Sequence, residues 1–400
     1  MIATLAMAAA FARRTVKSLH ALLDPDRARS TLNDFFIRSP WPAPEILRSA
    51  AMAAMNRMNL QRGERIQVIL DASQKAKRGT RMDALGWVRE AGSKEWRRGH
   101  RFLLCYLRVR GVMIPWAVDL CLSRKFLDSD ASRPLRERLP GIRFRALNEM
   151  AADIIRALPS EWRERYDVVV LLDSGFCNET VCGAVRAQGF RFIVAAQASR
   201  VLVKGTGEGR SGRRVVLGAC AHGCLRYQGR DVTLPPKRSG GRRRRFRVAE
   251  VVGRLRGLGE VKVVFSRRES DGSVISLACS DTRMDAREVA LEYGWRREIE
   301  VATKGLKGCL GLGQYQCRYY EGMLRHLRLS LLAHLLLTVA ELHRRGHDAC
   351  KKQEAVQLPS IRVLQSRLRL DLCRDLLARI RGSCSEPELI EHLLRALGAA

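Results

Sequence analysis

The sequence is poor in acidic residues, and this deficit decides its charge. Its 400 residues include 41 Asp and Glu but 72 Lys and Arg, which gives a formal net charge of +31 at pH 7. Solubility alone does not need so large an excess of one sign, and a field of this strength attracts polyanions. We therefore expect a polyanionic partner.

Long hydrophobic runs are scarce as well. The longest in the C-terminal half, Leu329 to Ala340, is interrupted by His334 and falls short of the roughly 18 residues that a membrane span needs. It predicts a buried helix, and we expect no membrane partner. The apolar stretch Met1–Ala12 is followed, not preceded, by Arg13 and Arg14, which is the wrong order for a secretory signal. We therefore expect a cytoplasmic protein.

Cysteine is too dilute to hold the fold together. Twelve cysteines in 400 residues do not make a disulfide scaffold, and a cytosolic compartment keeps thiols reduced. Cys220, His222 and Cys224 lie in a predicted loop beside Gly223. No second pair at ligand spacing follows them, so zinc binding there is the less favoured interpretation.

Internal repeats are also absent, which excludes solenoids and propellers. Hydrophobic residues make up 46% of the chain, enough to bury a substantial core, so disorder is excluded for most of its length. A chain of this size predicts two or three structural units. Its strand and helix signals follow the order β-β-β-α-β-α-β behind a helical N-terminal region, which predicts an α/β fold with a mixed sheet.

The strand signals place two acids at the ends of strands. Ile66–Leu70 is a β-prone run that ends at Asp71, and the apolar run Val168–Leu172, typical of a strand in the middle of a sheet, ends at Asp173. Two further β-rich runs meet at Gly111, the pattern of an antiparallel hairpin. The other expected elements are the hairpin strands Arg101–Arg110 and Val112–Leu120, helices over 133–158 and 179–188, and a strand over 190–196.

Shifts in composition along the chain predict five segments. Residues 1–60 form a helical domain, 61–198 the first part of the α/β domain, 199–284 a β-rich insertion, 285–345 the second part of the α/β domain, and 346–400 a charged helical tail. The insertion carries a basic run from Lys237, which is either a solvated loop or a phosphate contact. Its strongest part is Arg242, Arg243, Arg244 and Arg245.

A third acid lies in a helical segment after the insertion. Tyr293, Arg296, Glu300 and Lys307 have the spacing Tyr-x2-Arg-x3-Glu-x6-Lys, which on one continuous helix places all four within an arc of about 60°. Taken alone, such a face is more often an exposed helix with ion pairs along it. Together with Asp71 and Asp173, however, Glu300 makes three carboxylates that could converge.

Three converging acids repel one another unless a cation lies between them. Hard oxygen ligands with open positions suit Mg²⁺ or Mn²⁺. Two such ions can activate the attacking oxygen and stabilise the leaving oxygen of a phosphoryl displacement. We therefore expect Asp71, Asp173 and Glu300 to hold metal ions in a protein whose positive charge suits a phosphodiester substrate.

These motifs are similar to those of the DDE transposases of bacterial insertion sequences. The resemblance covers most of the chain and lies with the group that has the Tyr-x2-Arg-x3-Glu-x6-Lys signature and a β-strand insertion before the catalytic Glu. The matching blocks are Ile69–Ser73 with Lys75–Gly79, Leu171–Phe176, Tyr293–Lys307, and Leu310–Leu312 with Arg325–Leu327. The chain departs from many relatives in having Arg297 where they have Trp, and Asp71-Ala72-Ser73 where they have Asp-Asp-Thr.

The resemblance implies a ribonuclease-H-like sheet flanked by helices, in which Asp71, Asp173 and Glu300 bind two Mg²⁺ ions. Water would cut the phosphodiester at the transposon end, and the freed 3′-hydroxyl would attack target DNA, in a cut-and-paste reaction. Tyr293, Arg296 and Lys307 would contact the DNA backbone. The resemblance also implies that the N-terminal helices help to bind the terminal inverted repeats. It further implies a homodimer on paired ends, and a place at the nucleoid.

Two other functions stay open from the sequence. One is a catalytically inactive, transposase-derived protein that binds DNA with the same basic surface. The other is a generic ribonuclease-H-like nuclease of RNA–DNA hybrids, which is less favoured because the β-rich insertion and the basic run would have no evident purpose.

Overall fold

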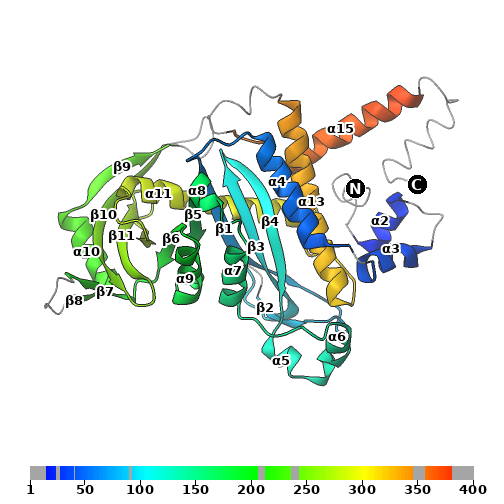
Figure 1. Cartoon of the computed structure of the whole chain (residues 1–400), viewed down its shortest axis with the longest axis horizontal. Coiled ribbons are helices and arrows are strands. Elements are labelled where there is room, and N and C mark those ends of the chain that lie inside the picture. The colour runs from blue at the N-terminus through cyan, green and yellow to red at the C-terminus, as the bar shows by residue number, and fades with distance from the viewer. Residues whose placement is uncertain are drawn as a thin grey trace. The chain divides into compact units, whose positions relative to one another are not determined.

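The computed structural model describes residues 15–23, 28–39, 41–89, 92–205, 212–235, 243–345 and 356–380 (Figure 1). By their internal contacts the residues group into two compact units. The first unit comprises Met1–Leu60, Ala72–Ala146 and Glu300–Ala400, and the second Gln61–Asp71 and Leu147–Ile299. The boundary runs through one strand, β1 (Arg65–Ala76), and one helix, α12 (Arg297–Cys309). The five segments expected from the sequence stay a prediction.

The second unit is built on a mixed, mostly antiparallel sheet. Its strands lie in the order β1-β5-β6-β12-β11-β10-β7-β8, and β9 pairs with β10. Neighbours among β1, β5 and β6 are parallel, whereas every later pair is antiparallel. The strands after β1 are β5 (Asp167–Leu172), β6 (Arg191–Ala196), β7 (Val201–Lys204), β8 (Arg213–Val216), β9 (Arg230–Leu234), β10 (Arg244–Leu255), β11 (Gly259–Arg268) and β12 (Val274–Cys279).

The two neighbouring strands that lead to the predicted acids are buried over Ile66–Leu70 and Val168–Leu172. Val168–Leu172 is almost wholly inaccessible to solvent, as the apolar run predicts. The prediction that the other strand ends at Asp71 is wrong, because β1 continues to Ala76. A strand is held by its backbone ladder, so one polar side chain does not end it, and the amide of Lys77, just beyond β1, still donates to the Arg98 carbonyl.

Helices flank the sheet of the second unit. α7 and α9 pack side by side, α9 also packs on β6, and α11 covers β6, β10, β11 and β12 (Figure 1). The single helix expected over 133–158 is in fact two, because α6 ends at Arg138 and α7 begins at Leu147. The helices of this unit are α7 (Leu147–Arg156), α8 (Trp162–Arg165), α9 (Glu179–Ala187), α10 (Leu217–Tyr227) and α11 (Ala286–Gly294).

Ion pairs fasten α11 to the start of β1. Arg65 lies 2.7 Å from a carboxylate oxygen of Glu288, 2.9 Å from one of Glu292 and 2.7 Å from one of Asp167. Gln67 donates a further bond of 2.7 Å to Glu292, whose side chain is 9% exposed. A carboxylate this buried is stable only while its partners remain, so α11 is fixed against the strand that leads to Asp71.

The first unit contains a long hairpin, β3 (Arg97–Val109) with β4 (Val112–Cys121), and a short strand β2 (Gly86–Val88) on β3. Arg110 and Gly111 both have positive φ, at 48° and 83°, as a two-residue hairpin turn requires, so the hairpin predicted at Gly111 is confirmed. The helices of the unit are α2 (Val16–Leu23), α3 (Arg29–Ile37), α4 (Ala43–Arg57), α5 (Arg124–Leu127), α6 (Arg133–Arg138), α13 (Tyr320–Arg344) and α15 (Ile361–Ile380).

The core of the first unit is the long helix α13. It packs on β4, α3, α4 and α15. A window of α13 is long and apolar enough to cross a membrane, with a mean hydropathy of 1.3, but 72% of that window is buried inside the protein. The buried helix predicted at Leu329 to Ala340 is therefore confirmed.

Candidate active site and basic pocket

Two of the predicted acids are neighbours in the second unit. Parallel pairing aligns Ile69 of β1 with Leu171 of β5, and Asp71 and Asp173 each follow this aligned pair by two residues on the same side of their strands. Asp173 keeps an extended backbone (φ −79°, ψ 178°), so the alignment continues through it. Adjacent strands lie about 4.8 Å apart. The two carboxylates thus leave the buried core at the same edge of the sheet.

A tight turn fixes the carboxylate of Asp173. Its Oδ1 accepts a hydrogen bond of 2.8 Å from the amide of Gly175 and caps the short helix that follows. A Cβ on Gly175 would lie 3.1 Å from this oxygen, so glycine allows the close approach. Asn178 then caps α9 by accepting a hydrogen bond from the amide of Val181, which directs the chain away from the acid.

The signature residues do not share one continuous helix, which corrects the sequence prediction. Tyr293 lies at the end of α11, a turn covers residues 295 and 296, and α12 starts at Arg297. Hydrogen bonds between residues three apart replace the regular four-residue spacing of an α-helix here. The Arg296 amide donates to the Tyr293 carbonyl, and the Ile299 amide donates to the Arg296 carbonyl. The turn changes the direction in which Arg296 projects relative to an ideal helix.

Arg296 contacts the first acid directly. Its Nη1 lies 3.4 Å from Oδ1 of Asp71, and the side chains are 14% and 18% exposed. Both belong to the second unit. The structure therefore pairs Arg296 with Asp71, and the guanidinium compensates the charge of this carboxylate.

Glu300 and Lys307 lie on α12 within the first unit. Glu300 is exposed and follows Arg296 by four residues along the chain. Lys307 is half-buried and donates a hydrogen bond of 2.9 Å from Nζ to the carbonyl of Gln74, in the second half of β1.

The donor set at the strand edge fits a hard divalent cation in its chemistry, since Asp71 and Asp173 offer carboxylate oxygens from adjacent strands. Across the described ranges, however, no group of three or more His, Cys, Asp or Glu side chains is arranged to hold a metal. The zinc ligands considered at Cys220, His222 and Cys224 lie on helix α10, and the expectation of a loop there is wrong. Cys220 and Cys224 are one helical turn apart, with their sulfurs at 3.7 Å.

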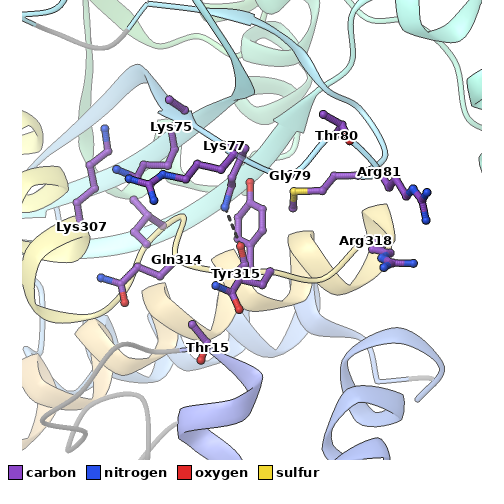
Figure 2. Close-up of a pocket in the computed structure, with 15 residues that line it drawn as sticks. Thr15, Lys75, Lys77, Gly79, Thr80, Arg81, Lys307, Gln314, Tyr315 and Arg318 are labelled. Carbon is purple, nitrogen blue, oxygen red and sulfur yellow. Dashed lines mark hydrogen bonds between the residues drawn. The ribbon is translucent and has the colours of Figure 1, made fainter.

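The first unit has a pocket of about 920 Å³ that the sequence did not reveal. We call it the basic pocket. Figure 2 shows Lys75 and Lys307 toward one end and Arg81 and Arg318 toward the other. It is lined by Thr15, Lys75, Ala76, Lys77, Arg78, Gly79, Thr80, Arg81, Met82, Lys307, Leu312, Gln314, Tyr315, Gln316 and Arg318.

Lys77 links the two sides of this pocket. Its Nζ donates to the carbonyls of Gly313 (2.7 Å) and Tyr315 (2.8 Å) and lies 3.5 Å from the centre of the Tyr315 ring (Figure 2). Burial, reinforced by the charge of Lys75, lowers the pKa of Lys77 to about 7. The amine therefore pins the segment before α13 to the end of β1 while carrying only part of a full charge near neutral pH.

Asp83 fixes the far end of the same loop. Its Oδ2 accepts hydrogen bonds from Arg138 (2.6 Å) and from the amide of Tyr320 (2.9 Å), and its own amide donates to the Arg318 carbonyl (2.8 Å). His100 also bonds to the Asp83 carbonyl, at 2.9 Å. The loop that carries Arg78 and Arg81 is thus anchored at both ends, by Lys77 and by Asp83.

The basic run of the β-rich segment is described only in part. Arg242 lies outside the described residues, and Arg243 precedes β10. Arg244 donates to the carbonyl of Pro235 at 3.3 Å, and Arg245 lies 3.9 Å from a carboxylate oxygen of Glu269. Burial, together with the nearby arginines Arg268 and Arg297, lowers the pKa of Arg244. Their contact with phosphate stays a prediction.

Sequence reasoning missed most residues of the basic pocket. In the sequence, Lys75–Gly79 stands out only through the family resemblance, and Lys307 only through the signature. Arg81 and Arg318 lie in loops, where no periodicity indicates which way a side chain projects. The signal in the sequence that could have pointed to the arginines of the pocket is the high density of Lys and Arg over Lys75–Arg81.

Comparison with known proteins gives one result. No curated protein matches the chain. The family model described as DDE superfamily endonuclease matches residues 2–223, which include Asp71 and Asp173 but end before the signature from Tyr293 to Lys307. Because this match covers more than half of the sequence, the chain belongs to the DDE superfamily of endonucleases.

Proposed function

We propose that the chain is a DNA transposase of the signature group described above. It cuts DNA strands at the ends of its own element and transfers them to target DNA on a ribonuclease-H-like sheet. Family membership supports a transposase-like nuclease that acts on DNA. The observation that supports the proposal most is the parallel register of β1 with β5, because these two buried strands lead to Asp71 and Asp173.

Glu300 is the third carboxylate of the proposed site. It is supported by its place in the signature and by its exposed position on α12, four residues after an arginine that contacts Asp71. DDE endonucleases generally use divalent metal ions. Asp71, Asp173 and Glu300 would hold Mg²⁺, or Mn²⁺ in its place, and the ions would supply activation of the attacking oxygen and charge stabilisation at the leaving oxygen.

The reaction has two phosphoryl transfers. In the first, a water oxygen bonds to phosphorus at the element's end while the bond from phosphorus to the 3′-oxygen breaks, leaving a 3′-hydroxyl. In the second, this hydroxyl attacks a phosphodiester of target DNA, and the 3′-oxygen of the target strand leaves. Tyr293, Arg296 and Lys307 position the backbone of the end during both steps, because phenol, guanidinium and ammonium groups all donate to phosphate oxygens.

The proposal requires Arg296 to leave Asp71. In the structure the guanidinium lies against the carboxylate at 3.4 Å. A DNA phosphate offers the guanidinium a charged partner that it can bind in a bidentate way. Substrate binding and release of the carboxylate are therefore coupled.

A catalytically inactive DNA-binding protein is the second candidate. The pairing of Arg296 with Asp71 favours it, because the guanidinium occupies a carboxylate that catalysis needs. Both candidates share the further proposals of a cytoplasmic, nucleoid-associated protein and of a homodimer on paired terminal inverted repeats.

Strand cleavage by an Asp173→Asn variant tests the proposal. The assay uses purified protein, Mg²⁺ and DNA that carries the element's own ends. We expect at least about a thousandfold loss of cleavage, because several kcal/mol of charge stabilisation depend on the carboxylate, while DNA binding is kept. The matched control is Asp271→Asn, an exposed acid on the β11–β12 turn, which should cleave like the parent.

Other outcomes of this assay separate the candidates. Binding to the ends without metal-dependent cleavage by the parent protein would support the inactive candidate. Cleavage that persists in Asp173→Asn would remove that residue from the site. Cleavage of RNA–DNA hybrids without cutting of the element's ends would favour a generic ribonuclease-H-like nuclease.

A further inference from the structure

The lining of the basic pocket is unusual in its charge. Six of its fifteen lining residues are Lys or Arg, and none is Asp or Glu. Like charges this close repel, so the pocket is held together against its own electrostatics. An anion that entered it would relieve this repulsion.

Three of the cations are available to such an anion. Arg78, Arg81 and Arg318 are exposed, and none of them forms an ion pair with an acid within the described ranges. Their backbone is nonetheless fixed, because Lys77 and Asp83 anchor the loop and the Asp83 amide holds the Arg318 carbonyl. Fixed backbone with free guanidinium groups is the arrangement that binds phosphate at low entropic cost.

The pocket has no surface on which a nucleic-acid base could stack. Its one aromatic residue, Tyr315, is 1% exposed and has the Lys77 ammonium over its ring. The uncharged polar groups at its wall, Thr80, Gln314 and Gln316, are hydrogen-bonding residues suited to phosphate and sugar oxygens. The chemistry therefore favours a backbone over a base or a free nucleoside.

We propose that the basic pocket binds consecutive backbone phosphates of the DNA strand, through Arg78, Arg81 and Arg318, a few nucleotides away from the bond that is cut. This proposal rests on the proposed function, because the site of cutting is placed by Glu300.

The distance from Glu300 to Lys307 along α12 sets how far along the DNA the pocket lies from the cut. Lys307, which lines the pocket, follows Glu300 by seven residues on the same helix and within the same unit. At a rise of 1.5 Å per residue these positions are about 10 Å apart. One strand of duplex DNA carries a phosphate every 3.4 Å along the axis, so the Lys307 end of the pocket meets the backbone about three nucleotides from the cut, and Arg81 and Arg318, toward the other end, meet phosphates farther from it.

The salt dependence of DNA binding tests the pocket. The variant Arg78→Gln/Arg81→Gln/Arg318→Gln is compared with Arg133→Gln/Arg136→Gln/Arg143→Gln, which removes the same charge from exposed positions of the same unit. On a duplex of unrelated sequence, log affinity falls as log salt rises, and each lost phosphate contact reduces the steepness of this fall by about 0.9. We expect a slope smaller by about two to three in the pocket variant and an unchanged slope in the control.

The position of the contact is tested on DNA with the element's ends. Ethylation of phosphates more than about three nucleotides from the cut should weaken binding of the parent protein, and the pocket variant should lose this interference. Equal slopes for the two variants, or interference that the pocket variant keeps, would overturn the proposal. If the slope falls as expected but Asp173→Asn still cuts DNA, the pocket stands and the proposed active site fails.

Discussion

The proposed site of Asp71 and Asp173, which we call the acid site, and the basic pocket are held in place by different kinds of structure. Asp71 and Asp173 extend two buried parallel strands, so their positions follow from a continuous backbone ladder and a dry core. Arg78 and Arg81 lie on a loop that is held at two points, Lys77 and Asp83. The first site is as rigid as the sheet, whereas the second depends on a few polar contacts.

This difference predicts whether a substitution changes stability and function separately or together. Around Asp71 and Asp173, stability comes from the apolar neighbours of the strands and the proposed chemistry from the carboxylates, so the two can be altered separately. In the basic pocket, the groups that hold the loop lie beside the groups that would bind phosphate, so one substitution affects both. The comparison shows that a charged loop depends on polar anchors for the course of its backbone, whereas at the sheet edge such contacts hold only the carboxylates.

The largest effect is expected from the strand beneath the acid site. Leu171 is 0% exposed and lies beside Ile69, so Leu171→Ala leaves a cavity that costs about 2–5 kcal/mol of unfolding free energy. Urea unfolding measures it. The control is Val252→Ala on β10, at a side chain 43% exposed, where we expect about 0.5 kcal/mol. Equal losses at both positions would mean that the buried strand is not what holds the acids.

The sheet edge was accessible from sequence because its pattern is local. An unbroken run from Val168 to Leu172 that stops at an acid predicts a buried strand and the position of Asp173. The mixed α/β fold flanked by helices follows from the order of such runs. The end of β1 was mispredicted because its second half is kept in the strand by backbone pairing, which side-chain polarity does not report.

The signature and the pocket show where this reasoning ends. Helical spacing placed Tyr293 and Lys307 on one face, but a turn at residues 295 and 296 divides the segment into two helices. The pocket combines the end of β1, the loop after it and the segment before α13, from distant parts of the sequence. Only tertiary contacts such as that of Lys77 with Gly313 bring them together.

A smaller effect is expected from the anchor at Asp83. Asp83→Asn keeps the size of the side chain but weakens its bonds to Arg138 and to the Tyr320 amide, which should cost about 1–3 kcal/mol of unfolding free energy. DNA affinity should fall a few-fold because Arg81 and Arg318 lose their fixed positions. The salt slope should stay nearly unchanged, since no cation of the pocket is removed.

The matched control for this anchor is Asp128→Asn, at an exposed residue after α5. Both variants add one positive charge to the net charge, which alone strengthens DNA binding. A rise in affinity for Asp83→Asn equal to that of the control would show that the loop needs no anchor, and the contrast between the two sites would then disappear.

The smallest effect is a proton coupled to DNA binding at Lys77. Because the pKa of Lys77 is lowered to about 7 in the folded protein, about half of these amines are charged at pH 7. A phosphate nearby favours the ammonium, so binding should take up about half a proton at pH 7 and weaken as the pH rises toward 9. Isothermal titration in buffers of different ionisation enthalpy measures the uptake, which Lys77→Met should abolish and Lys125→Met, at an exposed lysine, should not.

The effect of pH on stability has the opposite direction to its effect on DNA binding. The unfolded chain keeps the Lys77 proton up to its ordinary pKa of about 10.4, whereas the folded chain releases it near pH 7. The Lys77 side chain therefore favours folding more strongly as the pH rises from 7 to 10, and a difference in unfolding free energy between the parent and Lys77→Met that stays flat over this range would contradict a buried, partly neutral amine.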